Sequence, residues 1–100
     1  KTIFKDDVKL EEEVHKENEI LKNTFKNGEV VKQDICSPNG TLKERRILNG
    51  NEMEYSSFYE NGNIEQKAYF VNGKKEKEHL YYDKNGKLMK TEIYKNGIKQ

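Results

Sequence analysis

Asparagine precedes every glycine in this chain. The seven glycines are Gly28, Gly40, Gly50, Gly62, Gly73, Gly86 and Gly97. Asn-Gly is the dipeptide that type I′ hairpin turns prefer, because both central residues of such a turn take positive φ. The glycines lie 12, 10, 12, 11, 13 and 11 residues apart, which leaves about eight residues for each strand and too few for a crossover helix. The spacing therefore predicts an all-β fold, an open and twisted antiparallel β-meander of about eight strands.

The spacings alternate, so the repeating unit is a hairpin of 22–24 residues with two kinds of turn. Short turns follow closely on an apolar residue, as in Phe70-Val71-Asn72-Gly73. Long turns carry extra residues, as in Ser37-Pro38-Asn39-Gly40, where proline presets φ for a type I turn and glycine takes the left-handed position of a bulge. The strands before the long turns end in pairs of apolar or aromatic residues, namely Ile35-Cys36, Phe58-Tyr59 and Tyr81-Tyr82.

The chain length fits one domain, residues 1–100. Its repeats are predicted at residues 25–47, 48–69 and 70–93, with a partial repeat at 94–100. Residues 4–24 contain no glycine, but they align with the repeat that begins at Phe25, so we interpret them as a degenerate first repeat. Residues 9–19 are rich in Glu and Lys, and a short helix is the alternative to a strand in that segment.

The composition limits the core and the classes of function. Charged residues make up 37% of the chain and hydrophobic residues 32%, so a thick core is not expected and cross-strand pairs must supply much of the stability. The 19 basic and 18 acidic side chains nearly balance, which argues against a nucleic-acid-binding surface. Apolar runs are too short for a transmembrane helix. The compartment stays open, because a start at Lys1 is compatible with the removal of an export signal or a further domain.

Alternation within the strands divides the apolar side chains between the two faces of the sheet. Ala68 and Phe70 share one face with the corresponding residues of the other repeats. Ile47, Tyr69 and Ile93 fall at equivalent positions on the opposite face. Each face is therefore expected to carry a narrow apolar band near the turns and a charged middle.

The unit from Phe58 to Lys74, seen again from Tyr81 to Lys99, resembles the bacterial variant of the MORN repeat. Proteins with that repeat are often labelled putative antitoxin components. The resemblance covers residues 25–100, and it implies an elongated antiparallel sheet that serves as a binding or scaffolding module, without catalytic residues to transfer. One feature departs from the family: the glycine that commonly follows the short turn is replaced by Glu76 or Lys77, and in the preceding repeat by Met53 or Glu54.

The residues offer little for catalysis or metal binding. His15 and His79 have no second histidine or cysteine at ligand spacing, and we expect both at the surface or at strand ends. Cys36 is expected to be a packed thiol rather than a nucleophile, and as the one cysteine it excludes an internal disulfide. The carboxylates at Asp6-Asp7 and Glu11-Glu12-Glu13 lack the glycine-bearing loop of a calcium site. We therefore predict a protein that is not an enzyme and that uses no cofactor and no metal; a small hydrolase-like enzyme is the least favoured interpretation.

Protein binding is the function that the tyrosines favour, because tyrosine combines large contact area with a hydroxyl. The predicted site residues are Tyr59, Tyr69, Tyr81, Tyr82, Tyr94 and Ile93. A surface or peripheral-membrane-associated structural module is the alternative, since aromatic residues lie beside lysines. The edge at residues 87–100 contains no proline and invites pairing with a second copy or with a foreign strand. Nucleic acid is not an expected partner, because Arg45-Arg46 and Lys74-Lys75 each split between the two faces.

Overall fold

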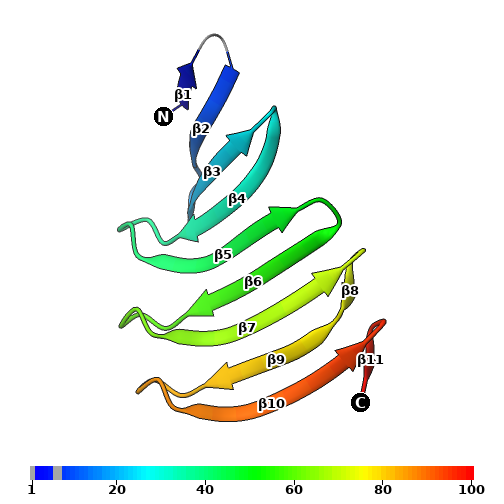
Figure 1. The fold of residues 1–100 in the computed structure, drawn as a ribbon. Coiled ribbons are helices and arrows are strands. Elements are labelled where there is room, and N and C mark those ends of the chain that lie inside the picture. Colours follow the sequence, from blue (N-terminus) through cyan, green and yellow to red (C-terminus); the bar gives the residue numbers. More distant parts are fainter. Residues whose placement is uncertain (1, 6–7) are drawn as a thin grey trace.

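The computed structural model describes residues 2–5 and 8–100, and it forms one open sheet of eleven strands (Figure 1). The strands are β1 (Thr2–Lys5), β2 (Val8–His15), β3 (Ile20–Lys26), β4 (Glu29–Cys36), β5 (Leu42–Asn49), β6 (Glu52–Phe58), β7 (Ile64–Val71), β8 (Lys74–Lys75), β9 (Lys77–Tyr82), β10 (Leu88–Lys95) and β11 (Ile98–Lys99). Consecutive strands pair antiparallel in sequence order, apart from β8, which pairs with β7 alone. The predicted all-β antiparallel meander is confirmed.

Eight of the strands have six to eight residues and correspond to the predicted strands. The other three, β1, β8 and β11, are shorter. Most of the segment 9–19 lies in β2, which settles the choice between strand and helix there in favour of the strand. The turn after it is closed by a hydrogen bond from the Lys16 amide to the Glu19 carbonyl, 2.8 Å.

The two kinds of turn differ in backbone geometry as their sequences predict. In the short turns at Asn27, Asn72 and Asn96, φ is 52–53° at asparagine and 78–82° at the following glycine, the pattern of a type I′ turn. In the long turns only the glycine has positive φ, and its amide bonds to the carbonyl three residues earlier, as from Gly40 to Ser37 at 2.8 Å. Those turns are type I turns closed by a bulge.

The turn at Gly50 forms a third variant. Asn49 pairs with Glu52, so Gly50 and Asn51 are the two central residues, and of these only Gly50 has positive φ, 62°. Glycine at the first central position is the signature of a type II′ turn. Its loop has two residues, as in the other short turns, but its asparagine is the last residue of the strand rather than the first residue of the loop.

The structure corrects the alignment of the long turns by one residue. Cys36 pairs with Leu42, Phe58 with Ile64 and Tyr82 with Leu88, each beside a register shift. Phe58 is therefore the equivalent of Tyr82, and the prediction that Tyr59 ends a strand at the Tyr82 position is wrong. Tyr59 instead occupies the first position of its turn, as Ser37 and Asp83 do in theirs. The two aromatic pairs look alike in sequence, whereas the glycine fixes the register.

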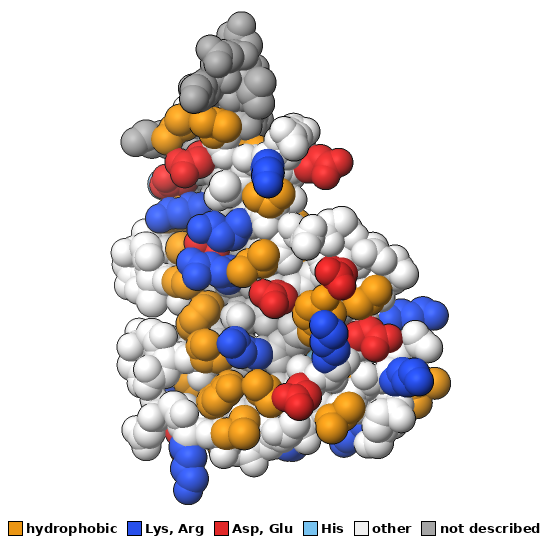
Figure 2. Space-filling view, in the orientation of Figure 1, with side chains coloured by type: hydrophobic (Ala, Val, Ile, Leu, Met, Phe, Trp, Pro, Cys, Tyr) orange, Lys and Arg blue, Asp and Glu red, His pale blue; other side chains and the backbone are white. Residues whose placement is uncertain are grey.

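The sheet is a single layer with a thin core. Its principal extents are 46 × 30 × 20 Å and its radius of gyration is 15.3 Å, whereas a compact chain of this length would have about 13 Å. Among the described residues, the buried apolar side chains are Ile35, Cys36 and Ala68. Figure 2 shows apolar and charged side chains interspersed over one face rather than gathered in one patch. Cross-strand pairs thus take over much of the role of a core.

Two residues that pair across neighbouring antiparallel strands point to the same face of the sheet. The strand register therefore shows which side chains lie on each face. Glu92 pairs with His79, and Lys90 with Tyr81. We call this the His79 face; it also bears Phe70, whose ring contacts that of His79. The opposite side, which bears Ile93 and the intervening residues of each strand, we call the Ile93 face.

A bulge separates β8 from β9. Phe70 pairs with Lys75, yet Lys67 pairs with Leu80, so two additional residues enter the strand opposite β7. Lys77 accommodates the bulge with a positive φ of 59°. A lysine therefore occupies a left-handed conformation at one of the two positions where the resemblance to MORN repeats expects glycine.

Substitutions at Lys77 test this strain. Lys77→Gly should be more stable than Lys77→Ala by about 0.5–1 kcal/mol, because the left-handed conformation costs an ordinary L-residue about 1–2 kcal/mol and glycine loses part of that gain as chain entropy. Both variants lose the ammonium that lies 4.2 Å from the centroid of the Tyr69 ring. The order should reverse at Glu54, in regular strand, where glycine should be the less stable variant. Chemical denaturation of the four variants checks both orders, and the same order at both sites would contradict the bulge.

Candidate functional site

The predicted site residues do not form one surface. Tyr81 and Tyr94 lie on the His79 face, opposite Lys90 and Lys77 respectively. Tyr69 and Ile93 lie on the Ile93 face, because each is adjacent in its strand to a residue of the His79 face, Phe70 and Glu92 respectively. Tyr59 and Tyr82 lie at the long-turn end, where the Tyr59 hydroxyl donates to the Tyr82 carbonyl at 2.7 Å.

The His79 side chain is completely buried, so the expectation of a surface or strand-end histidine is wrong. Its ring lies against those of Phe70 and Tyr94, with centroid distances of 5.7 and 4.7 Å. Nε2 faces the backbone of Tyr69, 3.4 Å from the amide nitrogen and 3.1 Å from the carbonyl oxygen. Beside the bulge the Tyr69 carbonyl accepts the Glu76 amide at 2.9 Å, and the imidazole lies against the same stretch of backbone. Nδ1 has no hydrogen-bond partner within the described part of the chain.

His15 and Cys36 agree with their expectations. His15 is exposed and bonds to the Glu13 carboxylate at 2.7 Å. Cys36 is a free, buried thiol. Burial of Cys36 is consistent with packing, and His15 lies on the surface.

Glu92 is the centre of a charged cluster on the His79 face. Lys99 lies 2.7 Å from its carboxylate and Lys90 lies 3.9 Å from it. The hydrogen bond from Lys99, followed by the one from the Tyr81 hydroxyl, lowers the pKa of Glu92 to about 2. Burial, followed by the bond to Glu92, raises the pKa of Tyr81. Since β11 supplies Lys99, this cluster fixes β11 against the edge of the sheet.

Acid should weaken the fold through Glu92. A carboxylate whose pKa is lowered from 4.5 to about 2 stabilises the folded state fully above its unfolded pKa, and that stabilisation is lost as the pH falls through the folded pKa. The melting temperature should therefore fall between pH 4.5 and pH 2, and Glu92→Gln should show a smaller fall. An NMR titration of the carboxyl carbon measures the pKa directly, and Lys99→Met should raise it. A Glu92 that titrates at its ordinary value would contradict the cluster.

The other tyrosines also use their hydroxyls and rings within the sheet. The Tyr55 hydroxyl donates to Glu44 at 2.8 Å, and burial, followed by this bond, raises the pKa of Tyr55 to about 12. A hydrogen bond to Glu52, followed by burial, raises the pKa of Tyr69 to about 12. Lysine or arginine side chains lie over the rings of Tyr55, Tyr69, Tyr81 and Tyr94. The tyrosines thus stabilise neighbouring strands, and their free surface is smaller than the sequence suggests.

Exposed apolar side chains gather instead at the C-terminal edge. Leu88, Met89, Ile93 and Ile98 are 48–68% exposed. β11 covers only the end of β10, pairing with Tyr94 and Lys95, and the Gln100 amide donates to the Ile93 carbonyl at 2.7 Å. The stretch from Leu88 to Glu92 has no strand on its outer side among the described residues. The sequence indicated this edge, but it could not indicate how far β11 covers it.

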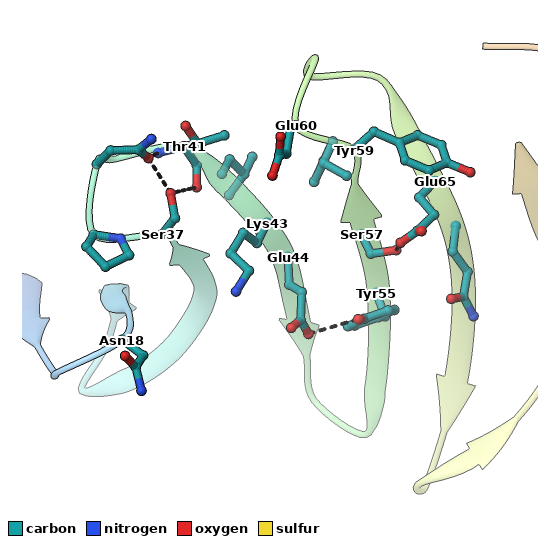
Figure 3. Close-up of a pocket in the computed structure, with 15 residues that line it drawn as sticks. Asn18, Ser37, Thr41, Lys43, Glu44, Tyr55, Ser57, Tyr59, Glu60 and Glu65 are labelled. Carbon is teal, nitrogen blue, oxygen red and sulfur yellow. Dashed lines mark hydrogen bonds between the residues drawn. The ribbon is translucent and has the colours of Figure 1, made fainter. Parts of the chain in front are cut away.

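A groove lies at the long-turn end of the His79 face (Figure 3). It has a volume of about 670 Å³ and lies between the turn at Ser37–Thr41 and the turn that begins at Tyr59. Glu44, Glu60 and Glu65 line it, with Lys43 as the basic side chain. Nothing in the sequence pattern pointed to this groove. A smaller hollow of about 550 Å³, lined among others by Tyr59, Asn61 and Lys84, lies between the next two long turns.

Comparison with protein-family models, with curated proteins and with solved structures gave no match to this chain. In residues 2–5 and 8–100, no helix is long and apolar enough to cross a membrane. The same part of the chain holds no group of three His, Cys, Asp or Glu side chains arranged to bind a metal ion. Asp6-Asp7 lies outside the described residues, and strand β2 places Glu12 on the opposite face from Glu11 and Glu13.

Proposed function

We propose that this chain is a non-enzymatic repeat module for protein–protein interaction or scaffolding, in which a partner strand pairs with the open edge of β10. The exposed apolar side chains on that edge are the observation that carries the proposal. An unpaired edge strand offers a row of amides and carbonyls to another chain. An antitoxin-like role, as the resemblance to MORN repeats implies, would be one case of such binding.

The geometry of β10 indicates which backbone groups would bind. The Ile93 carbonyl points away from β9, because it accepts the Gln100 amide. Alternation then directs the amide and carbonyl of Thr91 to the same open side, whereas those of Glu92 point toward β9. Lys87, Lys90, Lys95 and Lys99 surround this edge, so an acidic partner strand is favoured over a second copy of the same edge.

A proline at Thr91 tests edge pairing. Thr91→Pro removes an outward amide and should weaken partner binding by at least about tenfold, which corresponds to one lost backbone hydrogen bond and the steric block beside it. The partner is first captured with the wild-type chain from the native host and identified by mass spectrometry; calorimetry with the purified partner then gives the affinity. The folded sheet should persist, since Thr91 donates nothing to β9.

Glu92→Pro is the comparison variant: it removes an amide that points toward β9, together with the carboxylate that binds Lys99. It should lower the melting temperature more than Thr91→Pro does. A partner that binds the Thr91→Pro variant as tightly as the wild-type chain would exclude edge pairing. The surfaces around Tyr59, Tyr69 and Tyr81 would then be the next candidates.

A surface or peripheral-membrane-associated structural module is the alternative function. Exposed Met89 and Ile93 beside four lysines are the combination that favours contact with an anionic membrane surface. Flotation with vesicles of phosphatidylserine and phosphatidylcholine distinguishes the two functions. Binding to the mixed vesicles would favour the membrane-associated module if it is lost with vesicles of phosphatidylcholine alone and with the Met89→Glu variant.

A further inference from the structure

The second and third long turns are joined by three side-chain hydrogen bonds. The Tyr59 hydroxyl donates to the Tyr82 carbonyl at 2.7 Å, and the Nδ2 atoms of Asn61 and Asn63 each donate to the Lys84 carbonyl at 2.8 Å. Tyr59 is the first residue of its turn, so its ring crosses the gap to the next turn. In Figure 3 its ring extends away from Ser37 and Thr41.

The first and second long turns lack these connections. Ser37 occupies the position of Tyr59, and its hydroxyl bonds within its own turn, to Asn39 Oδ1 and to the Thr41 carbonyl. Thr41 occupies the position of Asn63 and has no amide group to donate. Among the described residues, no side-chain hydrogen bond joins these two turns, and the groove of about 670 Å³ lies between them. Ser37 lines this groove, so a tyrosine ring at position 37 would enter it.

The lining of the groove suits an aromatic ring with a basic neighbour. Pro38, Leu42 and Phe58 supply apolar walls. Three carboxylates also line the groove, those of Glu44, Glu60 and Glu65, and one ammonium group, that of Lys43. Glu65 accepts the Ser57 hydroxyl at 3.1 Å, and Glu44 accepts the Tyr55 hydroxyl and pairs with Arg46 at 3.4 Å. Glu60, in contrast, is exposed and forms no ion pair in the described part of the chain. The lining of the groove therefore carries an excess of negative charge, which attracts cations.

We propose that this groove binds a tyrosine side chain of a partner polypeptide, with a lysine or arginine next to that tyrosine. The proposal rests on the proposed protein-binding function and adds a second site with a defined partner chemistry. Tyr59 provides the template: its hydroxyl reaches the carbonyl of Tyr82, and the equivalent carbonyl in the first gap is that of Phe58. The bound ring takes the place of the missing side chain, and its basic neighbour pairs with Glu60.

The test uses short peptides and the complete chain. Acetyl-Lys-Tyr-Lys-amide at millimolar concentration should shift the amide NMR signals of residues 37–41 and 58–60 in a saturable way. Acetyl-Lys-Ala-Lys-amide should bind about tenfold more weakly, as expected for the loss of a buried aromatic ring. Acetyl-Glu-Tyr-Glu-amide should also bind more weakly, because its charges face Glu44, Glu60 and Glu65.

Two pairs of variants locate the site. Ser37→Tyr should fill the groove with the ring of the chain itself and abolish binding, whereas Ser37→Ala leaves the groove open and should bind normally. Glu60→Lys should reverse the preference between the Lys-Tyr-Lys and Glu-Tyr-Glu peptides, while Glu78→Lys, in β9, should not. The charge reversal keeps the test decisive if Ser37→Tyr fails to fold.

The remaining results overturn the proposal or separate it from the protein-binding function. Absence of saturable shifts at residues 37–41, or equal binding of the tyrosine and alanine peptides, excludes the tyrosine site. A captured partner that binds Ser37→Tyr normally but loses affinity for Thr91→Pro leaves the protein-binding function in place and excludes the groove as its site. Failure of the protein-binding function alone would appear as peptide binding in the groove without any partner for the edge.

Discussion

Replacing His79 by alanine should destabilise the fold more than any other single truncation that we consider, by about 3 kcal/mol. The imidazole is completely buried between the rings of Phe70 and Tyr94. Its removal leaves a cavity, and the Tyr69 amide loses the Nε2 atom that lies 3.4 Å from it, while the Tyr69 carbonyl keeps its bond from the Glu76 amide. Thermal unfolding should show a fall of roughly 10–20 °C, as expected for a domain of this size.

Two controls separate packing from hydrogen bonding. His79→Phe keeps a ring in the same space and loses the contact with Tyr69, so it should cost less than alanine, about 1–2 kcal/mol. His15→Ala removes an exposed ring, and its effect should stay within about 0.5 kcal/mol. Equal melting temperatures for His79→Ala and His15→Ala would show that His79 does not close the bulge.

The meander itself could be predicted from the sequence because its determinants are local. Each Asn-Gly pair marks a turn in which glycine takes a positive φ, and the spacing between glycines then sets strand length and direction. The division of faces followed from the same alternation, since Ala68 and Tyr69 point to opposite sides whatever lies beyond them. No long-range information was needed for these predictions.

The bulge between β8 and β9 could not be predicted, because it depends on how two strands meet. The residues after Gly73 resemble a regular strand, yet the register changes by two residues between β8 and β9. This change turns Lys77 into a left-handed residue and draws His79 into the gap. A histidine in a charged strand has no sequence signal for burial, although the missing glycine near Lys77 marked the place where regular geometry fails.

The candidate site was only partly predictable for a related reason. Tyrosine enrichment indicated binding, but the register directs the Tyr81 hydroxyl to Glu92 and the Tyr69 hydroxyl to Glu52, so these groups serve the sheet. The open edge at β10 was visible as a strand without proline. The groove beside Ser37 was not, because its lining comes from separate strands and turns that only the folded sheet brings together.

Placing valine at Gly73 is the second substitution with a large expected effect. Gly73 has a φ of 78° beside Asn72 at 53°, and a β-branched residue there should cost about 2–3 kcal/mol. No atom lies within 4 Å of an added Cβ, so the cost is conformational rather than steric crowding. The same turn bonds to its neighbour, from the Asn72 amide to the Asn51 carbonyl at 2.8 Å, and strain at Gly73 should weaken that contact too.

Two further variants decide whether the left-handed turn causes the loss. Gly73→Asn should cost less than about 1 kcal/mol, because asparagine tolerates positive φ. Val71→Thr keeps a β-branched residue in the strand and should cost at most about 1 kcal/mol. Val71→Thr and Gly73→Asn should therefore both melt at a higher temperature than Gly73→Val. The melting temperature of Gly73→Val should lie roughly 10–20 °C below that of the wild type. Equal losses for Gly73→Val and Val71→Thr would mean that Asn72-Gly73 does not form a type I′ turn, and the spacing of the Asn-Gly pairs would no longer explain the meander.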